Sequence, residues 1–146
     1  MSPLAVVVAL ALAAPVGIGQ PARDRDFELT ANSVDCGATV TDLAPQGQFC
    51  LVKVSARNVA GRSLRFTLSV FRQSAFAPDG TRYTVDAAAT ENASDGKNPF
   101  VVPVNPGNSV SGMLVFDIPA SSSVAKLKLC ESVISPCIEV VTATAR

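Results

Sequence analysis

Residues 105–119 constrain the fold of this chain most, because they combine a tight turn with a strictly alternating strand. Asn105, Pro106 and Gly107 supply the fixed and the permissive backbone angles that a chain reversal needs. After the turn, successive residues alternate between two faces, one carrying Val110, Gly112, Leu114, Phe116 and Ile118 and the other Ser111, Met113, Val115 and Asp117. Pro119 ends the run, because proline has no N–H to donate to a sheet. The stretch predicts a half-buried antiparallel strand.

Short segments of the same kind recur along the chain and are separated by turn signals. With the strand described above they are residues 27–36, 49–58, 64–71, 81–85, 100–104, 125–131 and 137–144. This count of about 7–8 strands predicts an all-β, immunoglobulin-like antiparallel β-sandwich, with a closed small barrel as the alternative. The strands at 49–58 and 64–71 are expected to be adjacent or nearly so. Residues 86–98 are expected to form the longest exposed loop.

Composition narrows the size and the chemistry of the protein. A chain of 146 residues with 48% hydrophobic residues is long enough for one domain with a core. Its 12 basic and 12 acidic residues cancel, and no block of Lys or Arg predicts nucleic acid or an anionic membrane as a partner. Histidine is absent, which removes the commonest general base and the commonest metal ligand. We therefore expect no catalytic residues, no metal site and no cofactor.

The N-terminal segment predicts export. Residues 2–19 carry no charge, and an apolar run at 4–14 is followed by proline and small residues, as in a secretory leader. The run is shorter than the roughly 20 residues that a membrane span needs, so no stable span is expected after processing. Gly17 and Gly19 favour cleavage before Gln20, and Ala11-Leu12-Ala13 is a second candidate. The predicted organisation is a signal peptide at 1–19, a linker at 20–26 and a sandwich domain at 27–146.

Four cysteines in an exported chain predict a disulfide framework. They are Cys36, Cys50, Cys130 and Cys137, which allow three pairings. None of their spacings is Cys-x-x-Cys, so a thiolate metal site or a redox centre is disfavoured. Two Asp-Gly pairs, at Asp79 and Asp95, lack the series of oxygen ligands that a calcium loop needs, and are expected to be plain turns.

The strand phases choose among the three disulfide pairings. Leu127 and Leu129 take core positions in one segment, as do Ile138 and Val140 in the next. If the two segments form a hairpin, one register places Cys130 opposite Cys137, Lys128 opposite Glu139 and Leu127 near Val140. That register satisfies a disulfide, a charge pair and an apolar pair together. It leaves Cys36 to pair with Cys50.

Three groups of residues resemble motifs of a known family. They are residues 47–54 (GQFCLVKV) leading to Asn58; Phe76 with Asp79-Gly80 and Tyr83; and Asn105-Pro106-Gly107 with residues 115–119 (VFDIP). In this order, over residues 27–141, they resemble the telokin-like, immunoglobulin-fold group of exported bacterial proteins. That group includes a domain family of unknown function, frequent in Gram-positive lipoproteins, and the mycobacterial secreted immunogenic proteins. The resemblance implies an extracellular or cell-envelope sandwich, with no catalytic residues to carry over. This chain has no lipidation cysteine, which favours a released protein.

The expected function is that of a secreted or cell-envelope binding module that contacts an unknown protein or envelope component. The residues that would bind a ligand are not identified by the sequence. One alternative is a small extracellular enzyme that uses paired carboxylates or a Ser/Lys arrangement, for which Ser121-Ser122-Ser123 is more simply a loop. Another is a structural envelope protein. Because the cysteines are expected to be oxidised and histidine is absent, the protein is predicted not to be an enzyme.

Overall fold

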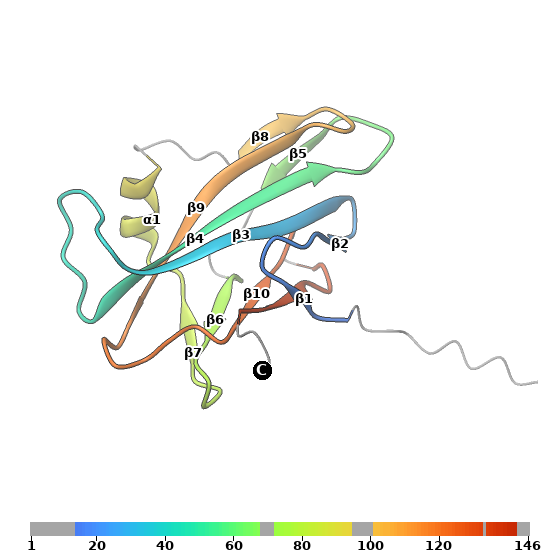
Figure 1. The fold of residues 1–146 in the computed structure, drawn as a ribbon. Coiled ribbons are helices and arrows are strands. Elements are labelled where there is room, and N and C mark those ends of the chain that lie inside the picture. Colours follow the sequence, from blue (N-terminus) through green and yellow to red (C-terminus); the bar gives the residue numbers. More distant parts are fainter. Residues whose placement is uncertain (1–13, 68–71, 95–100, 133, 143–146) are drawn as a thin grey trace, which may run out of the picture.

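The structure, a computed structural model, describes residues 14–67, 72–94, 101–132 and 134–142. These residues form eleven strands and one short helix (Figure 1). Their bounds are β1 (Val16–Gly17), β2 (Ala22–Asp24), β3 (Phe27–Ala38), β4 (Gln48–Asn58), β5 (Leu64–Thr67), β6 (Ser74–Phe76), β7 (Arg82–Thr84), α1 (Ala87–Ala93), β8 (Val101–Val104), β9 (Ser109–Ile118), β10 (Lys126–Leu129) and β11 (Ile138–Val141). The prediction of an all-β antiparallel sandwich is confirmed.

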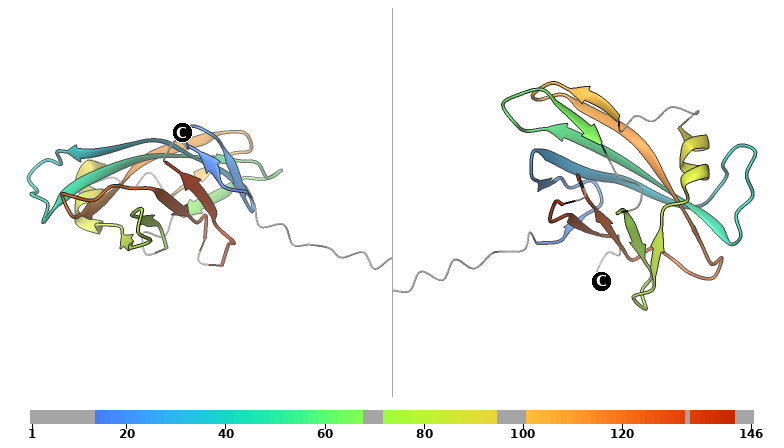
Figure 2. Two further views of the ribbon diagram at one scale, coloured as in Figure 1. Left: turned by 60° about the horizontal axis from the view of Figure 1, so that its bottom comes forward. Right: turned by 180° about the vertical axis from the view of Figure 1, so that it is seen from behind.

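The strands are arranged in two main sheets. One has the order β2-β3-β4-β9, and the other has the order β1-β11-β10-β6-β7. Side views show the long strands β3, β4 and β9 lying across the shorter strands of the second sheet (Figure 2). A separate pair, β5 and β8, forms a two-stranded sheet. The strands expected at 49–58 and 64–71 to be adjacent or nearly so are not hydrogen-bonded to each other, because β5 pairs with β8 while β4 pairs with β3 and β9.

The core lies between the sheets and follows the predicted phases. In β9, Leu114 and Phe116 are completely buried and Ile118 is nearly so. In β4, the alternate residues Cys50, Val52, Val54 and Ala56 are completely buried. Strand β5 adds Phe66, whose ring centroid lies 4.7 Å from that of Phe27 in β3. Burial of this apolar surface is the main force that holds the sheets together.

The loop expected at 86–98 contains a helix, so that prediction is wrong for its first half. Asp86 caps α1, its Oδ1 accepting a hydrogen bond from the N–H of Ala89 at 3.0 Å. The helix covers the outer face of β9, where a second apolar cluster contains Val40, Phe49, Ala89 and Val115. A helix of 7 residues is too short to be stable by itself, so its stability comes from tertiary packing.

The N-terminal boundary of the domain is also earlier than predicted. Strand β1 pairs in parallel with β11, Val16 opposite Val140, and the N–H of Gly19 donates to the carbonyl oxygen of Ala31 at 2.8 Å. Strand β2 pairs with β3, so residues 22–24 are part of a sheet and the predicted linker at 20–26 is wrong. The domain therefore begins at or before Val16, inside the predicted leader.

Several predictions fall on residues that lie outside the described ranges. These are residues 1–13 of the predicted leader, 68–71 of a predicted strand, 95–98 of the predicted loop with the Asp95-Gly96 turn, Phe100 at the start of a predicted strand, and the last residues, 143–146. Among the helices of the described ranges, none has the length and apolar character that a membrane crossing requires.

Candidate functional site

The hairpin of β10 and β11 carries one of the two disulfides. Cys130 is bonded to Cys137 and Cys36 to Cys50, the pairing that the strand phases predict. The register also agrees, with Lys128 opposite Glu139 and Leu127 opposite Val140. The charge pair that was predicted between Lys128 and Glu139 has a different lysine, because Glu139 Oε1 lies 3.5 Å from the Nζ of Lys126. Lys128 is therefore left without that counter-charge.

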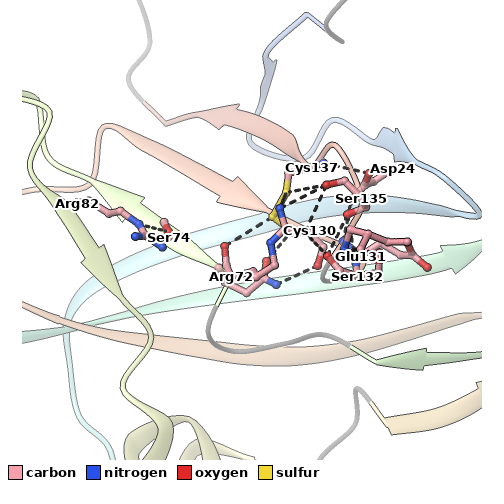
Figure 3. Close-up of a disulfide and its surroundings, with 11 residues drawn as sticks. Asp24, Arg72, Ser74, Arg82, Cys130, Glu131, Ser132, Ser135 and Cys137 are labelled. Atoms are coloured by element: carbon pink, nitrogen blue, oxygen red, sulfur yellow. Dashed lines mark hydrogen bonds between the residues drawn. A yellow bond between two sulfur atoms is a disulfide. The ribbon is translucent and has the colours of Figure 1, made fainter.

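Asp24, at the end of β2, holds the loop that the Cys130–Cys137 disulfide closes (Figure 3). Its side chain is completely buried. Oδ2 accepts hydrogen bonds from the N–H of Glu131 and the hydroxyl of Ser135, both at 2.7 Å, and Oδ1 accepts one from the N–H of Cys137 at 3.2 Å. A carboxylate that is buried among three donors stabilises the loop, and solvent or substrate has no access to it.

Glu131 lies beside this clamp, and its carboxylate interacts with that of Asp24. Burial, and then the negative charge of Asp24, raise the pKa of Glu131 above its usual value. In the described part of the chain, its buried Oε2 has no hydrogen-bond partner. The pair does not match the predicted alternative of a carboxylate enzyme, because one member is sealed inside the fold.

The raised pKa of Glu131 predicts a pH dependence of stability. Because its pKa is higher in the folded than in the unfolded state, its contribution is fully present below about pH 4 and is lost as pH rises through the folded pKa. Glu131→Gln should therefore be more stable than wild type at neutral pH, and the difference should vanish in acid. Urea unfolding between about pH 3 and pH 7 measures the effect, with Glu91→Gln, at an exposed glutamate of α1, as the control. Equal pH profiles for wild type and Glu131→Gln would contradict the assignment.

Arg72 joins the disulfide loop to the neighbouring strand β6. Its Nη1 donates to the carbonyl oxygens of Ser132 and Ser135, and its Nη2 lies 3.2 Å from the Sγ of Cys137. Figure 3 shows the guanidinium between this loop and the side chains of Ser74 and Arg82. Its described partners are all neutral, so the positive charge of Arg72 is held in place but not neutralised.

The outer face of the sheet adds three more cations in regular rows. Across the strands, Lys126 lies opposite Phe76, which lies opposite Arg82. In the next row, Lys128 lies opposite Ser74. Nε of Arg82 donates to the Ser74 hydroxyl at 2.8 Å, and Nζ of Lys126 lies 4.7 Å from the centroid of the Phe76 ring. Strand pleating explains the arrangement, because Leu127 and Leu129 take the core positions of β10.

These side chains line a hollow of about 320 Å³. The lining residues are Arg72, Ser74, Phe76, Arg82 and Lys128, and we call this set the basic hollow. Salt bridges within the described residues join only Arg57 to Glu28 and Lys126 to Glu139, so none of the three cations of the hollow has a carboxylate partner there. Fixed, unneutralised cations around a concave surface are suited to binding an anion.

Comparison with known proteins places the chain in a family. The sequence pattern described as "Domain of unknown function (DUF4352)" matches residues 16–136. The chain belongs to the DUF4352 family. Its fold is similar to that of MPT63, a secreted protein from Mycobacterium tuberculosis, with a TM-score of 0.61 and 16% identity over 91% of this chain and 100% of that one. It is also similar to the yjhA protein from Bacillus subtilis, with a TM-score of 0.59 and 13% identity over 88% and 99% of the two chains.

A third similar structure is an uncharacterized β-sandwich protein from Clostridium difficile, with a TM-score of 0.53, 15% identity and coverage of 88% and 93%. No curated protein matches the sequence. At these identities the solved structures establish only that the DUF4352 fold is shared. The family match begins at Val16, in agreement with the place of β1 in the sheet.

Several residues on which the family resemblance rests have structural roles in this DUF4352 chain, whereas Phe76 lines the basic hollow. Asp117 accepts hydrogen bonds from the N–H groups of Gln46 and Gly47 at 2.7 and 3.0 Å. A Cβ at Gly47 would come within 2.1 Å of the carbonyl oxygen of Ile118, so only glycine fits. Asn58, which is completely buried, donates to the carbonyl oxygen of Val104 at 2.7 Å and so joins β4 to β8. These contacts stabilise the fold.

The other residues considered from the DUF4352 sequence also have structural roles. Oδ1 of Asp79 accepts a hydrogen bond from the N–H of Thr81 at 2.9 Å, which lowers the pKa of Asp79 and makes the predicted plain turn. Ser122 donates its N–H to the carbonyl oxygen of Pro119 at 2.9 Å, so the run of serines follows β9 as a turn. The basic hollow was not predicted, because its residues come from β7, β10, β6 and the turn before β6, and no cluster of charge marks them in the sequence.

Proposed function

We propose that this DUF4352 protein is a secreted or cell-envelope binding module, and that its basic hollow contacts an anionic partner. The observation that carries the proposal is the group of three cations without carboxylate partners among the described residues, set on one sheet of a chain with zero net charge. Cations that lie close together repel one another, and an anionic partner would relieve that repulsion. Binding would therefore be favoured by charge complementarity.

Rigidity also supports a binding role for this surface. Arg82 is held by Ser74, and Arg72 is held by a loop that a disulfide closes. Side chains that are already fixed lose less conformational entropy when a ligand binds. A binding role is favoured over catalysis because the described residues that line the hollow include no nucleophile paired with a base. Ser74, its one hydroxyl, accepts from a guanidinium, and an arginine does not act as a base.

An extracytoplasmic location is part of the proposal. Its support is the pair of disulfides, the uncharged N-terminal segment, and a shared fold with a protein described as secreted. Cleavage after Gly19 would remove β1, whereas cleavage after Ala13 would leave β1 and β2 in the mature chain. We therefore propose that export removes residues 1–13. N-terminal sequencing of protein from the culture medium should read Ala14 first, and a start at Gln20 would contradict this position.

The binding proposal is tested with an immobilised polyanion. Wild-type protein should bind dextran sulfate but not uncharged dextran, and binding should weaken as salt concentration rises. Lys128→Glu should weaken binding by about tenfold or more, because it removes one cation of the hollow and adds an anion. Lys53→Glu is the matched control, since it makes the same charge change on β4 in the other sheet. Equal losses in both variants, or no binding by wild type, would contradict the proposal.

A further inference from the structure

We infer that the basic hollow is a phosphate site, for either the free ion or a phosphomonoester. In this site Arg82 and Lys128 would donate to the phosphate oxygens, and Arg72 would add its charge. The inference rests on the proposed binding function and narrows its ligand to one chemical class. It follows from the charge, the free donors and the walls of the hollow.

The charge of the hollow favours a dianion. Arg72, Arg82 and Lys128 supply three positive charges, and the described residues that line the hollow include no carboxylate. A carboxylate ligand would neutralise one of these charges. A phosphomonoester carries about −1.5 to −2 at neutral pH and would neutralise two. The Coulomb energy of the filled site is therefore more favourable with phosphate than with a single carboxylate.

The donors that remain free identify the groups that would touch the ligand. Arg82 uses Nε for the Ser74 hydroxyl, and its two Nη groups have no partner among the described residues. Nζ of Lys128 is likewise without a hydrogen bond or ion pair in the described part of the chain. These nitrogens can donate to separate oxygens of a tetrahedral anion. Ser74 stays with Arg82 and fixes the direction of its guanidinium.

The apolar wall of the hollow, formed by Phe76, should favour a phosphate ester over the free phosphate ion. Phe76 is half-buried in the row between Lys126 and Arg82 and contributes apolar surface to the hollow. The volume of about 320 Å³ leaves room for carbon atoms beside a phosphate group. An ester whose carbons contact Phe76 should therefore bind more tightly than inorganic phosphate.

Arg72 acts as a positioning residue that depends on the disulfide loop. Both of its Nη groups are engaged by the loop, through the Ser132 and Ser135 carbonyl oxygens and the Cys137 sulfur. Opening the Cys130–Cys137 bond would free this loop and with it the guanidinium. The variant with both Cys130→Ser and Cys137→Ser should therefore lose about as much phosphate affinity as Arg72→Gln. Combining the changes should cause little further loss, because both remove the same contribution.

The test is isothermal titration calorimetry of the oxidised protein at constant ionic strength and about pH 7.5, where phosphomonoesters are mostly dianionic. The probes are glycerol phosphate, inorganic phosphate and acetate. We expect one binding site, with glycerol phosphate tightest and acetate at least about tenfold weaker than either phosphate. Arg82→Gln and Lys128→Gln should each weaken phosphate binding by about tenfold or more, and Lys53→Gln should leave it unchanged. Thermal melts show first that each variant is folded.

Two results would overturn the inference. One is acetate binding as tightly as phosphate, and the other is an equal loss of phosphate affinity in Lys53→Gln and Lys128→Gln. Inorganic phosphate binding as tightly as the ester would support the site and assign the free ion as its ligand. A third result is possible: neither glycerol phosphate nor inorganic phosphate binds, but dextran sulfate binds in a way that depends on Lys128. That result would reject the phosphate site and still support the proposed binding function. Failure of both assays would reject the two proposals together.

Discussion

Replacing Phe116 by alanine should lower the free energy of unfolding by about 3 to 5 kcal/mol. The ring is completely buried in β9, and the neighbouring core residues Leu114 and Ile118 are fully or almost fully buried as well. Its removal would leave a cavity between the two sheets that the paired strand β4 cannot close. Because a domain of this size has a total stability of about 5 to 15 kcal/mol, the loss is a large share. Urea unfolding followed by circular dichroism measures it.

Met113 provides the matched control in the same strand. It lies on the other face of β9, is partly exposed and is paired with Lys53 of β4. Met113→Ala should cost less than about 1 kcal/mol, because little apolar surface becomes exposed. If Met113→Ala destabilised the protein more than Phe116→Ala, the strand would be turned over and the core described above would be wrong.

Asp24→Ala should destabilise the protein by about 3 kcal/mol or more, since it removes a buried carboxylate that accepts three hydrogen bonds. The donors belong to Glu131, Ser135 and Cys137, so the loss falls on the disulfide loop and on its contact with β2. Asp24→Asn keeps the shape of the side chain but has a single acceptor oxygen, and should fall between alanine and wild type. Chemical unfolding of oxidised protein measures all three.

Asp35 is a suitable control for Asp24, because it is an exposed aspartate in β3. Asp35→Ala should change stability by no more than about 0.5 kcal/mol. Similar melting curves for Asp24→Ala and wild type would show that the clamp contributes little, and the domain boundary at β2 would then lose its energetic support. Hydrogen exchange of the Glu131 and Cys137 amides would locate the effect, since these N–H groups lose their acceptor.

The clamp connects the N-terminal strands to the proposed site. Asp24 holds the loop that in turn holds Arg72, and Arg72 lines the basic hollow. A chain that lacked β2 would lose the carboxylate along with the strand. Correct processing of the N-terminus is therefore expected to matter for ligand binding as well as for stability.

Local patterns in the sequence were enough to predict the sheets and the disulfides. Period-2 alternation identified the faces of β4 and β9 that point between the sheets, because alternate residues of a pleated strand point to the same side. The same alternation predicted the register of β10 with β11 and hence the bond between Cys130 and Cys137. Turn residues such as Gly107, with φ of 82°, and Gly80, with φ of 89°, marked where the strands end.

Only the tertiary structure decided the helix, the N-terminal boundary and the candidate site. Helix α1 is too short for a periodic signal and depends on packing against Val115. Strands β1 and β2 are too short to alternate visibly, and β1 is held by β11 at the other end of the chain, while β2 pairs with the strand that follows it, β3. Arg72 precedes β6, Arg82 lies in β7 and Lys128 lies in the distant strand β10, and the three meet because β10, β6 and β7 are neighbours in one sheet. Charge clusters of this kind depend on strand order, which the pattern within a single strand does not specify.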